Sequence, residues 1–234
     1  RMAQFYDPSF HSESTKINPE ESKHIVRVLR MSEGQSLEIV DGKGHRYTGR
    51  ISAANPKGVE VEIEHRETVS QRNLYLHLAF SPTKNRDRTE WLLEKAVELG
   101  VEEITPLIGD HSERFKVNVE RWIKIMVSAM KQSQRAHLPI LNEVTKANDF
   151  WPKANERNKY LAHCSDGEKI ALTDIESDEL VIAIGPEGDF STREIENGLT
   201  AGWTPLSLGD MRLRTETAGL ISCAAVALKA MNLR

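Results

Sequence analysis

The sequence predicts an α/β protein with a mostly parallel sheet, preceded by a smaller unit that is mostly β. After Asn73, short apolar runs alternate with helix-like patterns, as in sheets covered on both faces. The first seventy residues instead contain strand-like runs with little helix. Residues 64–72 are polar and unperiodic, so we expect the domain boundary there, with residues 1–70 and 71–234 as two domains.

The N-terminal domain begins with a helix signal. Asn18 can cap a helix, Pro19 suits its first turn, and two acidic residues follow. The apolar stripe predicted for this helix consists of Ile25, Val26, Val28 and Leu29. Three strand-like runs come next: Ser36–Val40, His45–Ile51 and Val59–Ile63, the first two joined by a glycine-rich turn. This arrangement favours a small β-barrel, an architecture that often binds nucleic acid.

In the C-terminal domain, a strand over Leu74–Phe80 is followed by a basic loop and a helix that ends near Leu99, with Gly100 as its stop signal. The further elements that we expect are strand 103–108, helix 119–136, strand 140–144, a short helix near 148–157 and strand 159–163.

Two glycine-punctuated segments complete the chain. An apolar run over Leu180–Ile184 precedes Gly185-Pro186-Glu187-Gly188, and Leu206-Ser207-Leu208 precedes Gly209. Each reads as a buried strand that ends in a turn and leads into a helix. Ser191 and Glu194 predict a capping box for the first helix, and Thr215 or Thr217 can cap the second. Such turns present free backbone N–H groups at the sheet edge where open α/β folds bind ligands.

Familiar catalytic signatures do not explain these turns. The first turn lacks the Lys-Ser/Thr of a P-loop and the glycine spacing of a dinucleotide fingerprint. No serine stands in a nucleophile-elbow pattern. The histidines and cysteines have no metal-ligand spacing, so the sequence predicts no metal site. We therefore expect a pocket that holds its ligand mainly through backbone groups.

Composition places weaker limits on function. The net charge of −4 argues against a dedicated nucleic-acid binder, but basic residues outnumber acidic ones from Lys23 to Arg50, and Lys84–Arg88 is a second basic cluster. A polyanion-binding face and an ordinary mixed-charge surface remain equally compatible with this pattern. No apolar run is long enough to span a bilayer, and the N-terminus has no apolar leader. With two cysteines, the sequence favours a cytoplasmic protein.

These residues resemble a known family. Gly-Pro-Glu-Gly after an apolar strand, then Leu-Gly, then Leu213-Arg214-Thr215-Glu216-Thr217-Ala218 at the last helix, is similar to the SPOUT superfamily of knotted methyltransferases. Within it, the chain most closely resembles the small-subunit (16S) rRNA uridine-N3 methyltransferases. Further matches are Glu94–Val101, Ser112-Glu113-Arg114, Gln132-Ser133 with Arg135, and Arg27-Val28-Leu29-Arg30, so the resemblance extends over essentially the whole chain.

The resemblance implies a PUA-like RNA-binding β-barrel followed by a SPOUT domain with a deep trefoil knot, working as a homodimer on small-subunit rRNA or the assembled small ribosomal subunit. The implied cofactor is S-adenosylmethionine (SAM). Carried over by position, its site consists of His163, Cys164, Ile184, Gly185, Pro186, Glu187, Gly188, Leu208, Gly209, Leu213 and Thr215.

The implied reaction also needs catalytic and RNA-binding groups. N3 of uridine carries a proton at neutral pH, so a base or a stabiliser of the uridine anion is required. Arg114 and Arg214 are candidates for holding negative charge, and Glu216 or Glu187 for accepting the proton or orienting an arginine. For RNA phosphate contacts the resemblance implies Arg27, Arg30, Arg46, Lys84, Arg86 and Arg88.

The chain departs from the family pattern in three segments. Asp189 stands where glycine is usual, Met211-Arg212 replaces an arginine followed by an aliphatic residue, and Lys131 and Gln134 alter a polar run. A non-catalytic RNA-binding or ribosome-assembly protein is the alternative function, and an enzyme acting on a nucleotide phosphate is disfavoured by the missing lysine and metal ligands.

Overall fold

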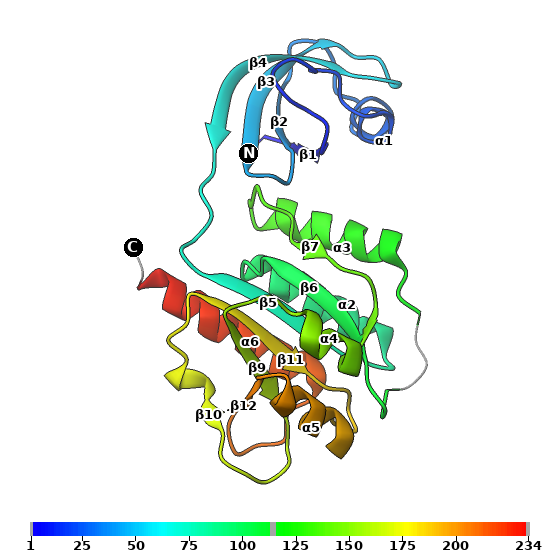
Figure 1. Cartoon of the computed structure of the whole chain (residues 1–234). Coiled ribbons are helices and arrows are strands. Elements are labelled where there is room, and N and C mark those ends of the chain that lie inside the picture. The colour runs from blue at the N-terminus through cyan, green and yellow to red at the C-terminus, as the bar shows by residue number, and fades with distance from the viewer. Residues whose placement is uncertain (1, 113–115, 233–234) are drawn as a thin grey trace. The chain divides into compact units, whose positions relative to one another are not determined.

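A computed structural model describes residues 2–112 and 116–232 of the chain (Figure 1). The chain divides into two compact units. One comprises the residues up to Gln71 together with Met130–Leu138, and the other comprises Arg72–Ala129 and the residues from Pro139 onward. The short segment 130–138 therefore belongs with the N-terminal residues although it lies in the second half of the sequence.

The first unit contains one four-stranded sheet in the order β1-β2-β3-β4. These strands are β1 (Gln4–Tyr6), β2 (Ser36–Val40), β3 (His45–Ala53) and β4 (Glu60–Thr68). β1 pairs with β2 in parallel, and the other neighbours are antiparallel. Residues 64–68 thus extend a strand, which corrects the prediction that 64–72 is wholly irregular. The side chains of this part of β4 are exposed, which explains why they are polar and show no alternation of apolar and polar residues.

A helix covers part of this unit, and its second half differs from the prediction. α1 (Pro19–Lys23) starts at Asn18, whose side chain accepts from the backbone N–H of Glu21 as expected. The chain then widens into a π-helix, η1 (His24–Val28), so Ile25 is buried while Val28 and Leu29 are 65% and 45% exposed. The predicted apolar stripe is wrong at these two positions, because a widened turn changes which residues share a face.

The second unit is built on a parallel sheet. The strand order is β10-β12-β9-β11-β5-β6-β7, with β8 also paired to β6, and every pairing is parallel. The bounds are β5 (Tyr75–Phe80), β6 (Glu103–Ile108), β7 (Ile140–Leu141), β8 (Thr145–Lys146), β9 (Asn158–Ala162), β10 (Ile170–Ala171), β11 (Glu179–Ile184) and β12 (Thr204–Ser207). The predicted α/β class with a parallel sheet is confirmed.

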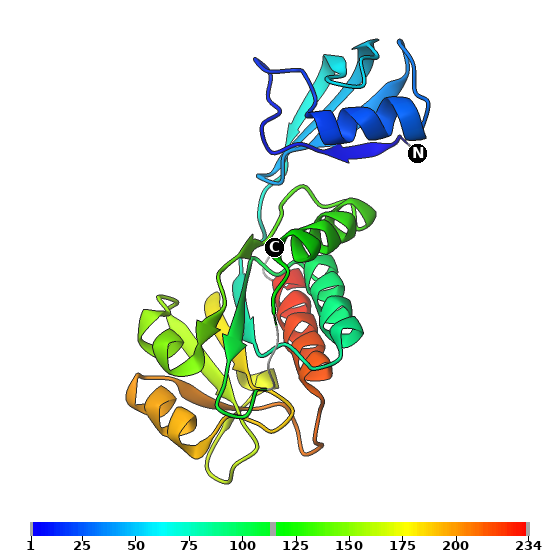
Figure 2. The same cartoon turned by 90° about the vertical axis from the view of Figure 1, so that its right-hand side faces the viewer.

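Helices cover both faces of this sheet (Figure 2). α2 (Arg86–Glu98) and α6 (Thr215–Met231) pack on each other, and α6 also contacts β5 and β11. On the other face, α4 (Ala147–Lys153) packs against α5 (Thr192–Thr200) over an aromatic core of Phe150, Trp151, Phe190 and Trp203. The remaining helices are α3 (Val119–Gln132) and the 3-10 turn η2 (Leu172–Asp174). In the described part of the chain, we find no helix with the length and apolar character needed to cross a membrane.

Several predicted boundaries shift. The helix expected over 119–136 ends at Gln132, because Gln134 adopts a left-handed backbone with φ of 58°. The strand expected over 140–144 is two short pieces, β7 and β8. The helix expected near 148–157 ends at Lys153 and contains Pro152. Gly100, in contrast, ends α2 with φ of 85°, as predicted.

Candidate active site

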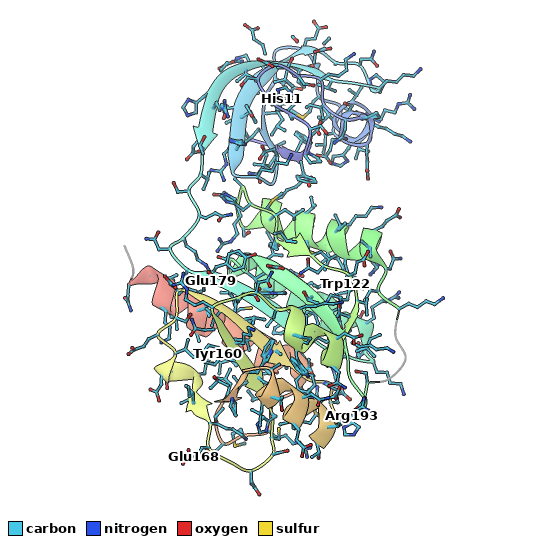
Figure 3. The ribbon with its side chains drawn as sticks, in the orientation of Figure 1. His11, Trp122, Tyr160, Glu168, Glu179 and Arg193 are labelled. Atoms are coloured by element: carbon cyan, nitrogen blue, oxygen red, sulfur yellow. The ribbon has the colours of Figure 1, made fainter. Side chains whose placement is uncertain are left out.

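A cavity of about 490 Å³ lies at the carboxyl edge of the parallel sheet. The segments that follow β9, β11 and β12 line it, together with the first turn of α6. β11 lies between β9 and β5, although β5 comes much earlier in the chain. The strand order therefore brings the ends of three late strands together, at the kind of edge where α/β sheets bind ligands. Figure 3 shows Tyr160 on β9 and Glu168 on the loop that follows this strand.

The turn after β11 is tightly packed, and Gly185 is required there. A Cβ atom at this position would lie 2.9 Å from the backbone nitrogen of Phe190, closer than real Cβ contacts allow. The Thr215 hydroxyl donates to the Gly185 carbonyl oxygen at 2.8 Å and so ties the turn to α6. The next residues form a second tight turn, in which the N–H of Asp189 donates to the carbonyl of Pro186. Backbone atoms of this segment are held in place for a ligand.

Asp189 connects two of the pocket segments. Its backbone is left-handed, with φ of 66°. The carboxylate accepts the N–H of Cys164 at 2.8 Å, from the segment after β9, and the N–H of Phe190 at 2.7 Å. A glycine here would suit the backbone but would leave both donors without this acceptor. The departure from the family pattern thus has a structural consequence that the sequence did not reveal.

The segment after β12 reaches α6 through an open loop. Gly209 has φ of 112°, which favours glycine, and Met211 is 79% exposed. Arg214 is the N-cap of α6 and makes no side-chain capping bond. The expectation that Thr215 or Thr217 caps this helix is therefore wrong. Thr215 is instead the first helical residue, and its hydroxyl is used on Gly185. The predicted Ser191–Glu194 capping box of α5 is confirmed.

A group of three charged side chains lies beside the cavity. The Arg88 guanidinium is 3.7 Å from a carboxylate oxygen of Glu187 and 3.8 Å from one of Glu216. Glu216 is only 7% exposed, and its Oε2 has no hydrogen-bond partner among the described residues. A carboxylate that is buried with one free oxygen can accept a proton or a hydrogen bond from a ligand. Arg88, predicted as a phosphate contact, lies against these two carboxylates.

His163 contributes a neutral ring to the cavity. Burial lowers the pKa of this imidazole, nearby Lys169 lowers it further, and Asp189 partly opposes both. The Nδ1 atom of His163 is buried and has no hydrogen-bond partner within the described residues. A buried polar atom without a partner costs free energy unless a bound molecule supplies one. This atom fits a pocket that binds a ligand with polar groups.

The cavity brings together most of the residues predicted for the cofactor. Its lining includes His163, Cys164, Ile184, Gly185, Pro186, Glu187, Leu208, Gly209, Leu213 and Thr215. Gly188 is the exception, and its carbonyl oxygen instead lies 3.0 Å from Nδ1 of His111. Sequence reasoning assigned no role to Lys169 and Asp210, which also line the cavity. Lys169 belongs to neither glycine-punctuated segment, whereas Asp210 directly follows Gly209 in the second.

The other predicted residues are more dispersed. Arg214 and Glu216 lie at the start of α6 but do not line the cavity, and Arg114 lies outside the described residues. Arg27, Arg30 and Arg46 belong to the first unit. Of these, Arg46 contacts Glu38 at 2.5 Å and Glu67 at 3.3 Å. Lys84 and Arg86 are exposed at the start of α2.

Comparison with known proteins identifies related sequences. Residues 70–227 match the RNA methyltransferase domain, and residues 17–64 match the RNA methyltransferase PUA domain. The ribosomal RNA small subunit methyltransferase E of Bacillus subtilis is 28% identical over 234 residues, which cover 93% of this chain and 91% of that protein. The protein of the same name from Aquifex aeolicus is 27% identical over 223 residues, with coverages of 93% and 95%.

Solved structures agree in fold over nearly the full length. The probable rRNA-methyltransferase of Porphyromonas gingivalis is 35% identical, with a TM-score of 0.89 and complete coverage of both chains. The small subunit methyltransferase E of Neisseria gonorrhoeae, bound to SAM, is 31% identical, with a TM-score of 0.83 and 98% coverage of each chain. The resemblance predicted from the sequence is confirmed: this chain, with its PUA domain and parallel α/β domain, belongs to the RNA methyltransferase family.

Proposed function

We propose that this protein transfers a methyl group from SAM to N3 of a uridine in small-subunit rRNA. The observation that carries the proposal is the cavity at the carboxyl edge, where the segments after β9, β11 and β12 meet the start of α6. The alternative, a non-catalytic RNA-binding or ribosome-assembly protein, gives no reason for so constrained a pocket. We also propose that residues 1–70 serve RNA binding and residues 71–234 serve methyl transfer.

The cavity suits SAM in size and in chemistry. Its volume of about 490 Å³ lies in the range of small-molecule pockets. The Gly185 turn offers backbone groups, and the buried Nδ1 of His163 has no hydrogen-bond partner among the described residues. We assign cofactor binding to the ten predicted residues that line the cavity and place Gly188 as a support for the turn. When bound, SAM supplies a methyl group on a positively charged sulfur, ready for in-line displacement.

The side chains near the cavity supply the remaining chemistry. We propose that Glu216 or Glu187 accepts the N3 proton and that Arg88 holds these two carboxylates in place. Arg214, exposed at the N-cap of α6, is suited to stabilise negative charge on the uracil oxygens or a neighbouring phosphate. Arg114 keeps the same role as a prediction from the sequence.

The first unit offers an RNA-binding surface. Arg27 and Arg30 are exposed and flank Val28 and Leu29, which are also exposed. Arg30 has a left-handed backbone with φ of 52°, so the chain turns sharply at this basic site. Guanidinium groups beside apolar side chains can contact both phosphates and bases. We assign phosphate contacts here and, on the second unit, to Lys84 and Arg86.

We further propose a homodimer that acts in the cytoplasm on rRNA or the small ribosomal subunit. Exposed apolar side chains on α6 and α2 support a dimer surface: Ile221, Leu228, Met231 and Trp91. A monomer mass in light scattering would exclude the dimer, and cell fractionation tests the location. The deep trefoil knot implied by the resemblance is also a proposal, and an experimental chain trace without a threaded C-terminal segment would exclude it.

The central test separates cofactor binding from catalysis. We expect calorimetry to detect SAM and S-adenosylhomocysteine, and mass spectrometry to detect N3-methyluridine in rRNA incubated with the enzyme and SAM. Gly185→Val should abolish SAM binding because any Cβ there meets the Phe190 backbone. Gly202→Val is the control, since a Cβ at Gly202 meets nothing within 4 Å. Its φ of 89° adds backbone strain that Gly185→Val does not have, so this control is the more demanding test of folding.

Failure of both ligands to bind at about 1 mM would contradict the proposed cofactor. Tight SAM binding with no N3-methyluridine on free rRNA or on small subunits would instead contradict the proposed substrate. Normal N3-methyluridine in a deletion strain would favour the non-catalytic alternative.

A further inference from the structure

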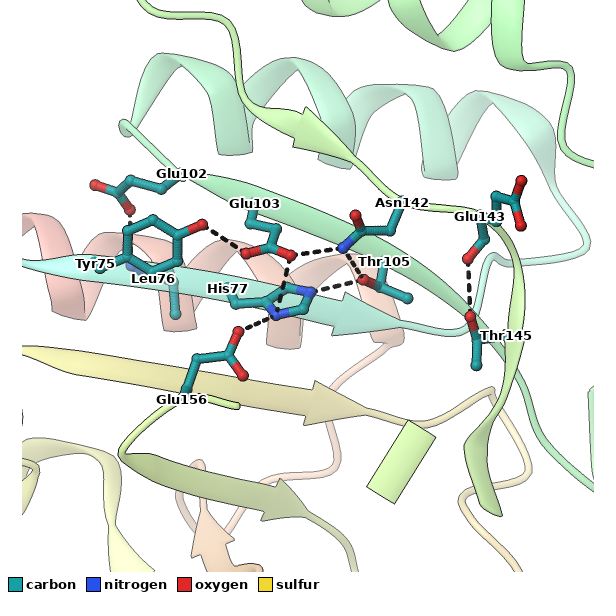
Figure 4. Close-up of polar contacts among 10 residues, drawn as sticks. All are labelled: Tyr75, Leu76, His77, Glu102, Glu103, Thr105, Asn142, Glu143, Thr145 and Glu156. Atoms are coloured by element: carbon teal, nitrogen blue, oxygen red, sulfur yellow. Dashed lines mark hydrogen bonds and ion pairs between the residues drawn. The ribbon is translucent and has the colours of Figure 1, made fainter. Parts of the chain in front are cut away.

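A second polar cluster lies inside the α/β unit, away from the carboxyl edge of the sheet (Figure 4). His77 on β5, Glu103 on β6 and Glu156 before β9 place one donor atom each within 4.8 Å of one another. Among the described residues, this is the one group of three His, Cys, Asp or Glu side chains that meets this criterion. A cavity of about 400 Å³ adjoins the cluster, lined by all three residues together with Asn142 and Thr105.

His77 is oriented so that its Nδ1 atom faces the carboxylates. Its Nε2 atom lies 2.6 Å from the Thr105 hydroxyl, and this hydroxyl also accepts from the Asn142 side-chain amide at 2.8 Å. Nδ1 lies 2.5 Å from Glu156 Oε1 and 3.8 Å from Glu103 Oε2. A histidine that ligates a metal typically uses its other ring nitrogen in just such a bond to a polar neighbour, which fixes the ring.

Glu103 is held by neighbours on both sides. The Tyr75 hydroxyl donates to its Oε1 at 2.5 Å, and the Asn142 amide donates to its Oε2 at 2.7 Å. These bonds fix the carboxylate beside the His77 ring rather than letting it turn to solvent. Outer hydrogen bonds of this kind are usual around carboxylate ligands.

Glu156 gives a second, independent indication of a ligand-binding site. Its side chain is 9% exposed, and its Oε2 is buried with no hydrogen-bond partner among the described residues. A buried carboxylate oxygen that has no hydrogen-bond partner is costly, and a bound cation would remove this cost.

We propose that His77, Glu103 and Glu156 form a binding site for a divalent transition-metal cation. One imidazole nitrogen with two carboxylate oxygens suits Zn²⁺, Mn²⁺ and Co²⁺. Ligands bonded to one such ion at about 2.0–2.2 Å stand roughly 3–4 Å apart. The distance of 3.8 Å between His77 Nδ1 and Glu103 Oε2 already lies in this range. The 2.5 Å contact to Glu156 must open slightly, or the free Oε2 must turn inward in its place.

The position of the site points to a structural task. Its ligands come from β5, from β6 and from the segment before β9, and β11 lies between β9 and β5. An ion would therefore join residues across the middle of the sheet, whose strands are paired in parallel. The spacing of these ligands in the sequence gave no signal, because each lies on a different element.

The test is metal binding by the full-length, tag-free protein after removal of metal with a chelator. We expect one Zn²⁺ or Mn²⁺ per chain by calorimetry and by the Mn²⁺ paramagnetic resonance signal, with a higher melting temperature. Bound Co²⁺ should show no thiolate charge-transfer band, which excludes binding at Cys164 or Cys223. Glu156→Gln and Glu103→Gln should each weaken binding by at least about tenfold, and Thr105→Val by a similar factor through the His77 ring.

Glu179→Gln is the matched control, because Glu179 lines the same cavity but is outside the three-ligand cluster. It should leave metal affinity unchanged. Absence of binding to the native protein at about 1 mM metal would overturn the site and identify the cluster as a hydrogen-bond network around His77. Equal metal affinity in the native protein and in a folded Glu156→Gln variant would overturn it as well. These readouts do not depend on methyl transfer.

Discussion

At the scale of single residues, Asp189 shows how one side chain can hold two segments of a pocket. Its carboxylate accepts backbone N–H groups from Cys164, in the segment after β9, and from Phe190, in the segment after β11. The family resemblance marked this position as a missing glycine that adds a carboxylate beside the cofactor loop. Its effect could not be predicted from the sequence, because the partner Cys164 follows a different strand and no local pattern connects the two.

We predict that Asp189→Ala lowers stability by about 1 kcal/mol and weakens SAM binding, because two backbone donors lose their acceptor. Asp189→Gly should weaken SAM binding equally but cost less stability, since glycine accepts the left-handed backbone. Urea unfolding and calorimetry measure the two effects. Asp166→Ala, an exposed change in the loop after β9, is the control. Equal stability of Asp189→Ala and Asp189→Gly would contradict this account.

His163 predicts a pH dependence. Its pKa is lowered in the folded protein, so the unfolded chain binds more protons below the ordinary value of about 6.5. Its stabilising effect is therefore complete above about pH 6.5 and is lost as the pH falls toward the folded pKa. Urea unfolding between pH 7.5 and 5.5 measures this.

His163→Gln should reduce that slope. The pKa of His137 is also lowered, mainly by burial, so His137→Gln measures the separate contribution of the first unit. An unchanged slope in His163→Gln would show that this histidine is not the titrating group.

At the scale of elements, most helices and strands of the parallel sheet were predictable. Apolar runs and glycine stops indicated β5, α2, β6 and β11, and Ser191 with Glu194 indicated the start of α5. The short β10 and β1 were missed because two or three residues carry no periodicity. The apolar stripe of the first helix failed at Val28 because a π-helical turn cannot be recognised from a 3.6-residue period.

The residues of the site were likewise only partly predictable from the sequence. Gly185, Leu208 and Thr215 were predictable because they sit in a motif that follows a strand. The partnership of Arg88 with Glu187 and Glu216 was not, since it depends on how α2 packs on α6.

The bond from Thr215 to Gly185 couples α6 to the turn after β11. We predict that Thr215→Val destabilises the protein by about 1–2 kcal/mol and weakens SAM binding, because the buried carbonyl loses its donor. Thr215→Ser should retain most of both. The exposed Thr217→Val is the control, and denaturant unfolding with calorimetry gives the values. Full SAM affinity in a folded Thr215→Val variant would show that the bond does not position the turn.

At the scale of the whole molecule, RNA binding and cofactor binding are assigned to separate units. We predict that the double change Arg27→Ala, Arg30→Ala weakens rRNA binding and lowers its salt dependence by roughly 1–2 units of the log–log slope. SAM affinity should stay unchanged, because the cavity lies entirely in the second unit.

Filter binding at several salt concentrations and calorimetry test this separation. Lys57→Ala with Lys16→Ala removes two other positive charges of the first unit and serves as the control. A similar loss from the control pair would mean that only the net charge matters.

The place of β11 has a consequence for synthesis on the ribosome. This strand fills the position between β5 and β9, yet its residues, 179–184, are made after more than three quarters of the chain. Until then β5 and β9 each have an unpaired edge, which in a nascent chain is open to wrong pairing. The last segments to emerge, from β11 to α6, both close this gap and line the cavity. A chain cut short anywhere before Ile184 therefore has neither a complete sheet nor a ligand pocket, so a prematurely terminated protein can neither bind the cofactor nor transfer a methyl group.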